Sequence, residues 1–204
     1  MSSSEPMPAL VVYVHGKGGS AAEAELYRPL FPDSEVLGLD YHGAAPWEAG
    51  PELRDAMERL RPRARRVTLI ANSIGAFFSM HAGVDAYVDR AFFISPIVDM
   101  ENLIGGMMRA AHVSEAELEA RGVLPTPFGE DLSWEYLSYV RSHPLRWAAP
   151  TAILYGEHDA LTSLDTITAF AEAHGASLRV MPGGEHWFHT PEQLRFLAAW
   201  ILES

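Results

Sequence analysis

The sequence of 204 residues contains no cysteine, which excludes disulfide bonds, thiol catalysis and cysteine-based metal sites. Positive charge is also scarce, since 15 Lys and Arg face 27 Asp and Glu for a formal net charge of −12. Nucleic acids and anionic membranes bind clustered positive charge, so neither is expected as a partner.

Long apolar runs are missing as well. The run Leu10–Val14 is too short for a signal sequence or a membrane span, and residues 1–7 carry no basic segment. We therefore expect residues 1–7 to form a disordered tail and residues 8–204 to fold as a single domain. Nothing in the sequence indicates export, so a cytoplasmic location is expected.

Short apolar runs rich in β-branched and aromatic residues alternate with segments typical of helices. The runs cover 9–14, 35–40, 67–71, 91–95, 151–155 and 177–181. Helices are expected at 21–31, 51–60 and 74–82, between Ser163 and Gly175, and after Thr190. Repeated strand–helix units predict an α/β fold with a doubly wound, mostly parallel, six-stranded sheet and helices on both faces.

The alternation is interrupted between Pro96 and Pro150. Here an apolar stripe ends in Met107 and Met108, and Ser114 with Glu117 forms a capping box that predicts a helix start. Because the interruption follows the end of a strand, we expect a helical insertion at about 97–149 that serves as a lid.

Ser73 lies between a strand and a helix, in the run Ala71-Asn72-Ser73-Ile74-Gly75. Small-x-Ser-x-Gly in this context is typical of a nucleophile elbow, a sharp turn that exposes a serine hydroxyl above the sheet. The same residues would also suit a plain helix cap.

Asp159 and His186 follow the ends of the fifth and sixth predicted strands. With Ser73 after the third, they give the order Ser, Asp, His at one edge of a parallel sheet. Here the chain resembles the α/β-hydrolase superfamily, and within it small esterase- or peptidase-like members with a helical lid. The resemblance covers residues 9–203 and begins at the third strand of the family's fuller sheet.

The resemblance implies that Ser73 is the nucleophile, His186 the base and Asp159 the acid of a catalytic triad. The backbone N–H groups of Lys17 and Ile74 would form the oxyanion hole. Asp99, which follows the fourth strand, is the alternative acid. Neither a metal-ligand spacing nor a nucleotide-binding fingerprint is present, so no metal and no cofactor are expected.

Substrate-pocket candidates are Met107, Met108, Trp134 and Trp187, whose soft or aromatic side chains suit an apolar pocket. The expected function is a serine hydrolase that cleaves small or medium carboxylic esters. An aminopeptidase or amidase is the alternative, with Glu101 or Asp131 binding the amine. A non-catalytic ligand- or partner-binding protein of the same fold is another, and the lid surface could serve a homodimer.

Overall fold

The computed structural model describes residues 7–204, so the predicted tail lies outside the described residues except for Met7. The described chain divides into two compact units. The sheet unit comprises the residues up to Val98 and those from Arg146 onwards. The insertion comprises Asp99–Leu145.

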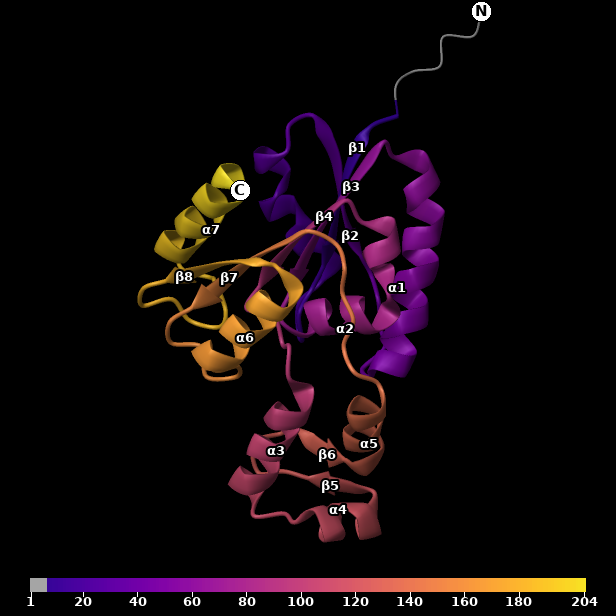
Figure 1. The fold of residues 1–204 in the computed structure, drawn as a ribbon, viewed down its shortest axis with the longest axis vertical. Coiled ribbons are helices and arrows are strands. Elements are labelled where there is room, and N and C mark those ends of the chain that lie inside the picture. The colour runs from indigo at the N-terminus through magenta and orange to yellow at the C-terminus, as the bar shows by residue number, and fades with distance from the viewer. Residues whose placement is uncertain (1–6) are drawn as a thin grey trace, which may run out of the picture. The chain divides into compact units, whose positions relative to one another are not determined.

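The sheet unit is built on six parallel strands among residues 7–204, in the order β2-β1-β3-β4-β7-β8 (Figure 1). The strands are β1 (Ala9–Val14), β2 (Ser34–Leu39), β3 (Arg66–Asn72), β4 (Arg90–Ile94), β7 (Thr151–Gly156) and β8 (Ser177–Met181). The predicted six-stranded parallel sheet is therefore confirmed, with each strand within a residue or two of its expected bounds.

Both faces of the sheet are buried, because neighbouring residues of one strand pack against different helices. Val11 and Tyr13 of β1 belong to a cluster with residues of α7 (Pro191–Glu203) and of the segment after β1. Val12, between them, is fully buried on the opposite face. Along β1, β3, β4 and β7 both faces are buried in this way, which explains why these strands read as continuous apolar runs. The edge strands β2 and β8 keep exposed residues such as Glu35 and Arg179.

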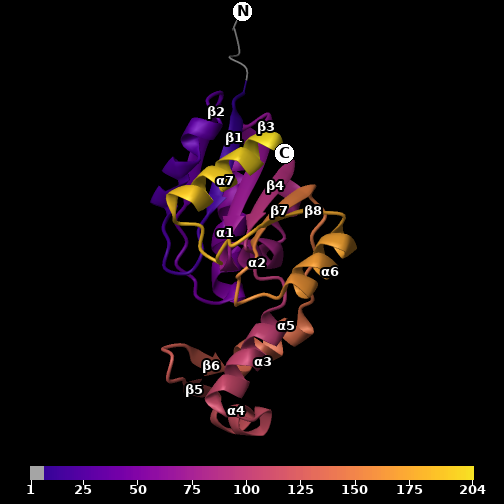
Figure 2. The same ribbon diagram turned by 90° about the vertical axis from the view of Figure 1, so that its left-hand side faces the viewer.

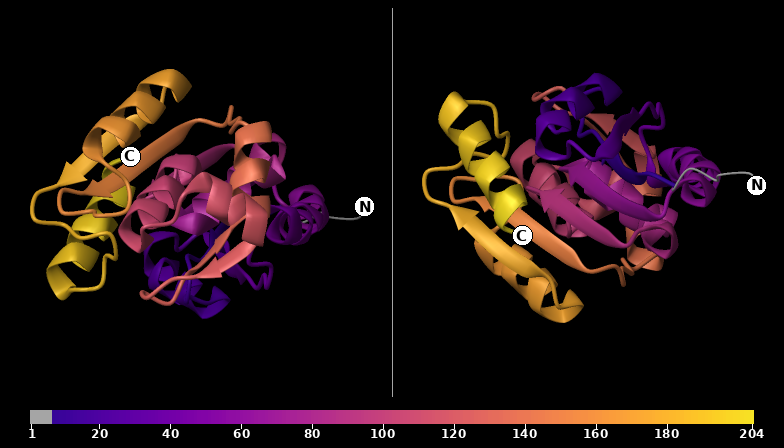
Figure 3. Two further views of the ribbon diagram at one scale, coloured as in Figure 1. Left: turned by 90° about the horizontal axis from the view of Figure 1, so that it is seen from below. Right: turned by 90° about the horizontal axis from the view of Figure 1, so that it is seen from above.

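The helices accordingly form two layers. α1 (Pro46–Leu60) and α2 (Ile74–Ala82) pack against each other on one face, and α7 covers the other (Figure 2). α6 (Leu164–His174) and α7 lie on opposite sides of β7 and β8 (Figure 3). Two short 3₁₀ segments, η3 (Arg61–Arg63) and η4 (Val84–Tyr87), follow α1 and α2.

The helix expected at 21–31 is not an α-helix. The structure has two 3₁₀ segments, η1 (Ala21–Leu26) and η2 (Arg28–Leu30). Pro29 lacks a backbone N–H and its ring clashes with the preceding turn of an α-helix, so the segment breaks into shorter turns.

The helix expected to begin at Pro51 begins at Pro46 instead. Pro46 occupies the first turn, where a missing N–H costs nothing, and the Glu48 carboxylate accepts from the N–H groups of Ala44 and Ala45. Pro51 lies inside the helix at the expense of one backbone hydrogen bond. The capping residues therefore decided the start of this helix.

The insertion contains three helices and a two-stranded antiparallel sheet within its described residues. These are α3 (Met100–Ala111), α4 (Glu115–Arg121), β5 (Val123–Pro125), β6 (Asp131–Ser133) and α5 (Trp134–Ser142). The helices agree with the sequence, whereas the hairpin was not expected, because three-residue strands are too short to show alternation. Leu118 and Leu137 are among the buried residues of the insertion.

Candidate active site

Ser73 occupies a sharp turn between β3 and α2, with φ 53° and ψ −121°. A non-glycine residue rarely adopts a positive φ, and such strain concentrates at functional sites. Two backbone hydrogen bonds hold the turn, since the Ser73 N–H donates to Ile94 O at 2.9 Å and the Ile97 N–H donates to Ser73 O at 3.2 Å. The ends of β3 and β4 thus fix the serine in place.

Two glycines allow the neighbouring loop to approach this turn. A Cβ on Gly16 would lie 3.1 Å from Ser73 Cβ, and a Cβ on Gly75 would lie 2.3 Å from the carbonyl oxygen of His15. Any side chain at Gly75 would therefore push the loop after β1 away from Ser73.

The His186 imidazole reaches Ser73 from the loop that follows β8. Its Nε2 lies 2.8 Å from Ser73 Oγ. The loop passes directly over Gly156, where a Cβ would lie 2.6 Å from Gly184 O, and the His158 N–H donates to the same oxygen at 2.8 Å. These contacts tie the end of β7 to the histidine loop.

Asp159 lies on the other side of the imidazole. Its Oδ2 is 2.7 Å from His186 Nδ1, and its side chain is fully buried while that of His186 is 22% exposed. Its Oδ1 accepts from the N–H groups of Leu161 and Thr162 at 2.8 and 3.3 Å. Because a carboxylate only accepts, Nδ1 donates, which leaves Nε2 as the acceptor for the Ser73 hydroxyl.

Asp99, the alternative acid, has a different place. It lies in the insertion, where its Oδ1 accepts from the Asn102 N–H at 2.9 Å and caps the start of α3. His186 is thus hydrogen-bonded to Asp159, whereas Asp99 caps α3.

The loop after β1 carries the expected oxyanion donor Lys17. The stacked rings of His15 and Tyr41 support this loop, with centroids 4.3 Å apart, and the Tyr41 hydroxyl donates to His15 O at 2.8 Å. The His15 Nδ1–H donates to Gly16 O, so this histidine shapes the loop. Ile74, the other expected donor, is the first residue of α2, where an N–H has no partner within the helix.

A cavity of about 410 Å³ opens beside Ser73 within the sheet unit. It is lined by Gly16, Lys17, Gly18, Gly19, Glu23, Asn72, Ser73, Leu161, His186 and Trp187. Trp187, a pocket candidate from the sequence, is 66% exposed, and Leu161 is 44% exposed. Sequence reasoning missed Leu161 and Glu23, although the Ser20–Glu23 spacing of a capping box could have drawn attention to the second.

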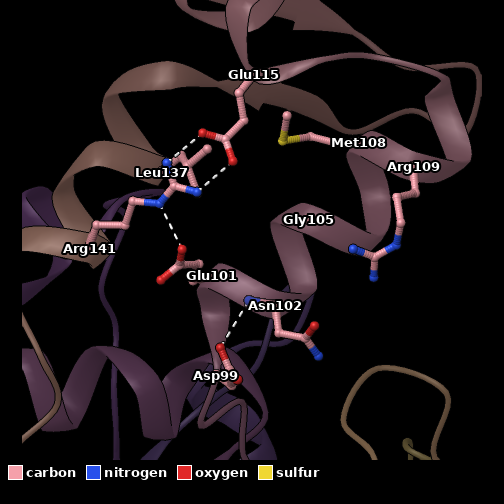
Figure 4. A pocket seen from close by; sticks show the side chains of 9 residues that line it. All are labelled: Asp99, Glu101, Asn102, Gly105, Met108, Arg109, Glu115, Leu137 and Arg141. Atoms are coloured by element: carbon pink, nitrogen blue, oxygen red, sulfur yellow. Dashed lines mark hydrogen bonds and ion pairs between the residues drawn. The ribbon is translucent and has the colours of Figure 1, made fainter.

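The other three pocket candidates lie in the insertion. Met108 is buried and lines a separate cavity of about 360 Å³, whereas Met107 and Trp134 are half-buried. Charged groups dominate this second cavity, because Arg141 donates to Glu101 and to both carboxylate oxygens of Glu115 at 2.7 Å each (Figure 4). The role of the three candidates in substrate binding stays a prediction, as does the lid.

Within residues 7–204, no group of three or more His, Asp or Glu side chains is arranged to hold a metal ion. In the same part of the chain, no helix combines the length and the apolar character needed to cross a membrane.

No protein-family model and no curated protein sequence matches this chain. Solved structures do match in fold. A putative hydrolase from Agrobacterium vitis S4 is 16% identical with a TM-score of 0.76, over 96% of this chain and 88% of that one. Est1E from Butyrivibrio proteoclasticus is 13% identical with a TM-score of 0.73, over 99% of this chain and 88% of that one.

A monoacylglycerol lipase from Paleococcus ferrophilus is 17% identical with a TM-score of 0.63, over 97% of this chain and 94% of that one. These similarities, with the sheet order and the elbow described above, show that the chain has the α/β-hydrolase fold.

Proposed function

We propose that this protein is a serine hydrolase that cleaves carboxylic esters through an acyl-enzyme on Ser73. The hydrogen-bonded row of Ser73 Oγ, His186 Nε2 and Asp159 Oδ2, at 2.8 and 2.7 Å, carries this proposal. A serine hydroxyl is a weak nucleophile at neutral pH and needs an adjacent base. Imidazole is suited to that task because it both accepts and returns a proton near pH 7.

In the first step, His186 Nε2 takes the proton from Ser73 as Oγ attacks the carbonyl carbon of the ester. The tetrahedral intermediate collapses, His186 gives the proton to the leaving alcohol, and the acyl group stays on Ser73. In the second step, a water molecule gives a proton to His186 and attacks the acyl group. As this second tetrahedral intermediate collapses, His186 returns the proton to Ser73 Oγ, which releases the carboxylic acid and restores the serine. Asp159 holds the imidazole tautomer and stabilises the imidazolium that forms in each step.

The intermediate carries a negative oxygen, which backbone N–H donors stabilise far better in a dry, preorganised site than water does. We assign this role to the N–H groups of Ile74 and Lys17. Ile74 directly follows the nucleophile at the start of a helix, and Lys17 lines the same cavity.

The dimensions of the cavity favour a small or medium substrate. About 410 Å³ is at the lower end of typical small-molecule sites, and the exposed Leu161 and Trp187 give it apolar surface. We favour esters as the substrate class, and the hydrogen-bonded row of Ser73, His186 and Asp159 supports acyl transfer to the serine.

Labelling with a fluorophosphonate probe tests the proposal, because the probe reacts with activated serines. We expect stoichiometric label on Ser73, identified by peptide mapping, and none on Ser73→Ala. The matched control is Ser163→Ala, which removes another serine before a helix, one that caps α6 and lies outside the cavity. This variant should still label fully. A folded wild-type protein that takes no label would overturn the proposal.

A further inference from the structure

Glu23 brings a carboxylate to the wall of the cavity that contains Ser73 and His186. The side chain extends from η1 and is half-buried. Its Oε2 accepts from the Tyr13 hydroxyl at 2.5 Å, and its Oε1 accepts from the Ser20 N–H at 3.2 Å. Both donors are neutral groups, so these contacts position the carboxylate without balancing its charge.

The carboxylate of Glu23 lies close against the backbone of the glycine loop. A Cβ on Gly19 would lie 2.7 Å from Glu23 Oε1, and a side chain there would displace the carboxylate. Tyr13 is almost fully buried, and its burial raises the pKa of its hydroxyl, which therefore stays a proton donor. An ionised carboxylate has about four acceptor positions, so Glu23 keeps acceptor capacity beyond these two bonds.

The other groups of the cavity wall suit a cation. Trp187 presents an exposed indole, and aromatic faces attract ammonium groups within about 6 Å. Apart from the imidazole of His186, Lys17 is the one basic side chain among the residues that line the cavity, and it already takes part in another interaction. The acidic chain, with a net charge of −12, also attracts cations at long range.

We propose that the cavity selects esters or amides that carry an ammonium group, which Glu23 binds beside the reacting carbonyl. This proposal rests on the proposed function and names its substrate class. It also assigns to Glu23 the binding of the amine that an aminopeptidase or amidase would need, in place of Glu101 or Asp131. Of the two residues considered from the sequence, Glu101 is already paired with Arg141 in the insertion.

Two pairs of isosteric esters test the proposal on either side of the scissile bond. Benzyl 3-aminopropanoate and benzyl butanoate differ by an ammonium in place of a methyl group on the acyl side. Choline butanoate and 3,3-dimethylbutyl butanoate differ by a quaternary nitrogen in place of carbon on the alcohol side. The readout is the ratio of kcat/KM between the charged and the neutral member of each pair.

We expect wild-type protein to favour the charged member of at least one pair by roughly tenfold, the effect of one charge-assisted contact. In Glu23→Gln, which keeps the shape of the side chain, that ratio should fall close to one. Glu25→Gln is the matched control, because it removes the same charge two residues away, where Glu25 pairs with Arg28 outside the cavity. The control should keep the wild-type ratio.

The outcomes separate the two proposals. Hydrolysis of both members of each pair with ratios near one in wild-type protein would overturn the ammonium site and leave the serine hydrolase standing. Equal losses of the ratio in Glu23→Gln and Glu25→Gln would also overturn it, since bulk charge would then explain the preference. If no ester is hydrolysed, calorimetric binding of the same pairs to Ser73→Ala decides the ammonium site independently. Equal binding of both members would reject it.

Discussion

The backbone of the turn at Ser73–Gly75 touches the backbone of the loop after β1, because the Cα of Gly75 packs against the carbonyl oxygen of His15. A Cβ on Gly75 would lie only 2.3 Å from that oxygen and 2.8 Å from Val14 O. Neither neighbour is the end of a flexible side chain, so the contact cannot be relieved by a rotamer change. A side chain at position 75 would therefore force these two backbone segments apart.

Gly75→Ala should destabilise the protein by about 3 kcal/mol or more, because the added methyl overpacks a buried site against backbone. Urea unfolding measures the change. Gly106→Ala in α3 is the control, since its Cβ would meet only the Arg109 guanidinium at an ordinary 3.7 Å. Alanine in a helix interior should stabilise by about 0.5–1 kcal/mol. Equal midpoints for the two variants would contradict the close contact.

Replacing Ser73 tests the strain at the turn. Its φ of 53° and ψ of −121° match a turn position that glycine occupies readily and other residues occupy at a cost. Ser73→Gly should therefore unfold with a free energy about 1–2 kcal/mol higher than Ser73→Ala. Both variants lack the hydroxyl, so they serve as each other's control in the same unfolding assay. A more stable alanine variant would show that the turn relaxes without strain.

Asp159→Asn should lower kcat for an ester by about 10,000-fold with little change in KM, because the amide favours the wrong imidazole tautomer. Asp99→Asn is the comparison, since Asp99 caps α3 and asparagine caps a helix equally well. That variant should keep its activity. A large loss of kcat in Asp99→Asn and a small one in Asp159→Asn would reverse the assignment of the acid.

Alkaline pH should destabilise the fold through its buried tyrosines. Burial is the main cause that raises the pKa of Tyr13 above its ordinary value of 10. The folded state therefore keeps this proton while the unfolded chain loses it, so the stabilising effect is complete below pH 10 and declines as pH rises above it. Tyr13→Phe should reduce the slope of unfolding free energy against pH, between pH 10 and 12, by about 1.4 kcal/mol per pH unit. Urea titrations at several pH values measure both slopes.

The central strands β1, β3, β4 and β7 could be predicted from the sequence because each is buried on both faces. Residues such as Leu69 and Ile70 point to opposite helical layers and are both fully buried, which leaves a continuous apolar run. The segments 21–31 and 46–60 were harder, since proline determines whether a helix breaks or begins only together with its capping partners. Glu48 provides such a partner at Pro46, and the sequence pattern alone gave it no priority over Pro51.

The proximity of Ser73, Asp159 and His186 could be anticipated, because each follows the end of a strand in the parallel sheet. Trp187 was expected in the pocket, whereas Glu23 was not, because it comes from a short 3₁₀ segment and reaches the cavity only through the path of the glycine loop. Leu161 lines the cavity for a similar reason, since its position follows from the turn that Asp159 holds. Such placements depend on loop geometry, which no periodicity encodes.

The pairing of β4 with β7 has a consequence for the rate of folding. These neighbouring strands are separated in sequence by the entire insertion, and an unstructured loop of that length slows the pairing through the entropy of closure. The insertion has its own buried leucines and local hairpin, so it can become compact before the strands meet. Its early collapse would shorten the effective loop, so that β4 and β7 would pair faster than across an unstructured loop of the same length.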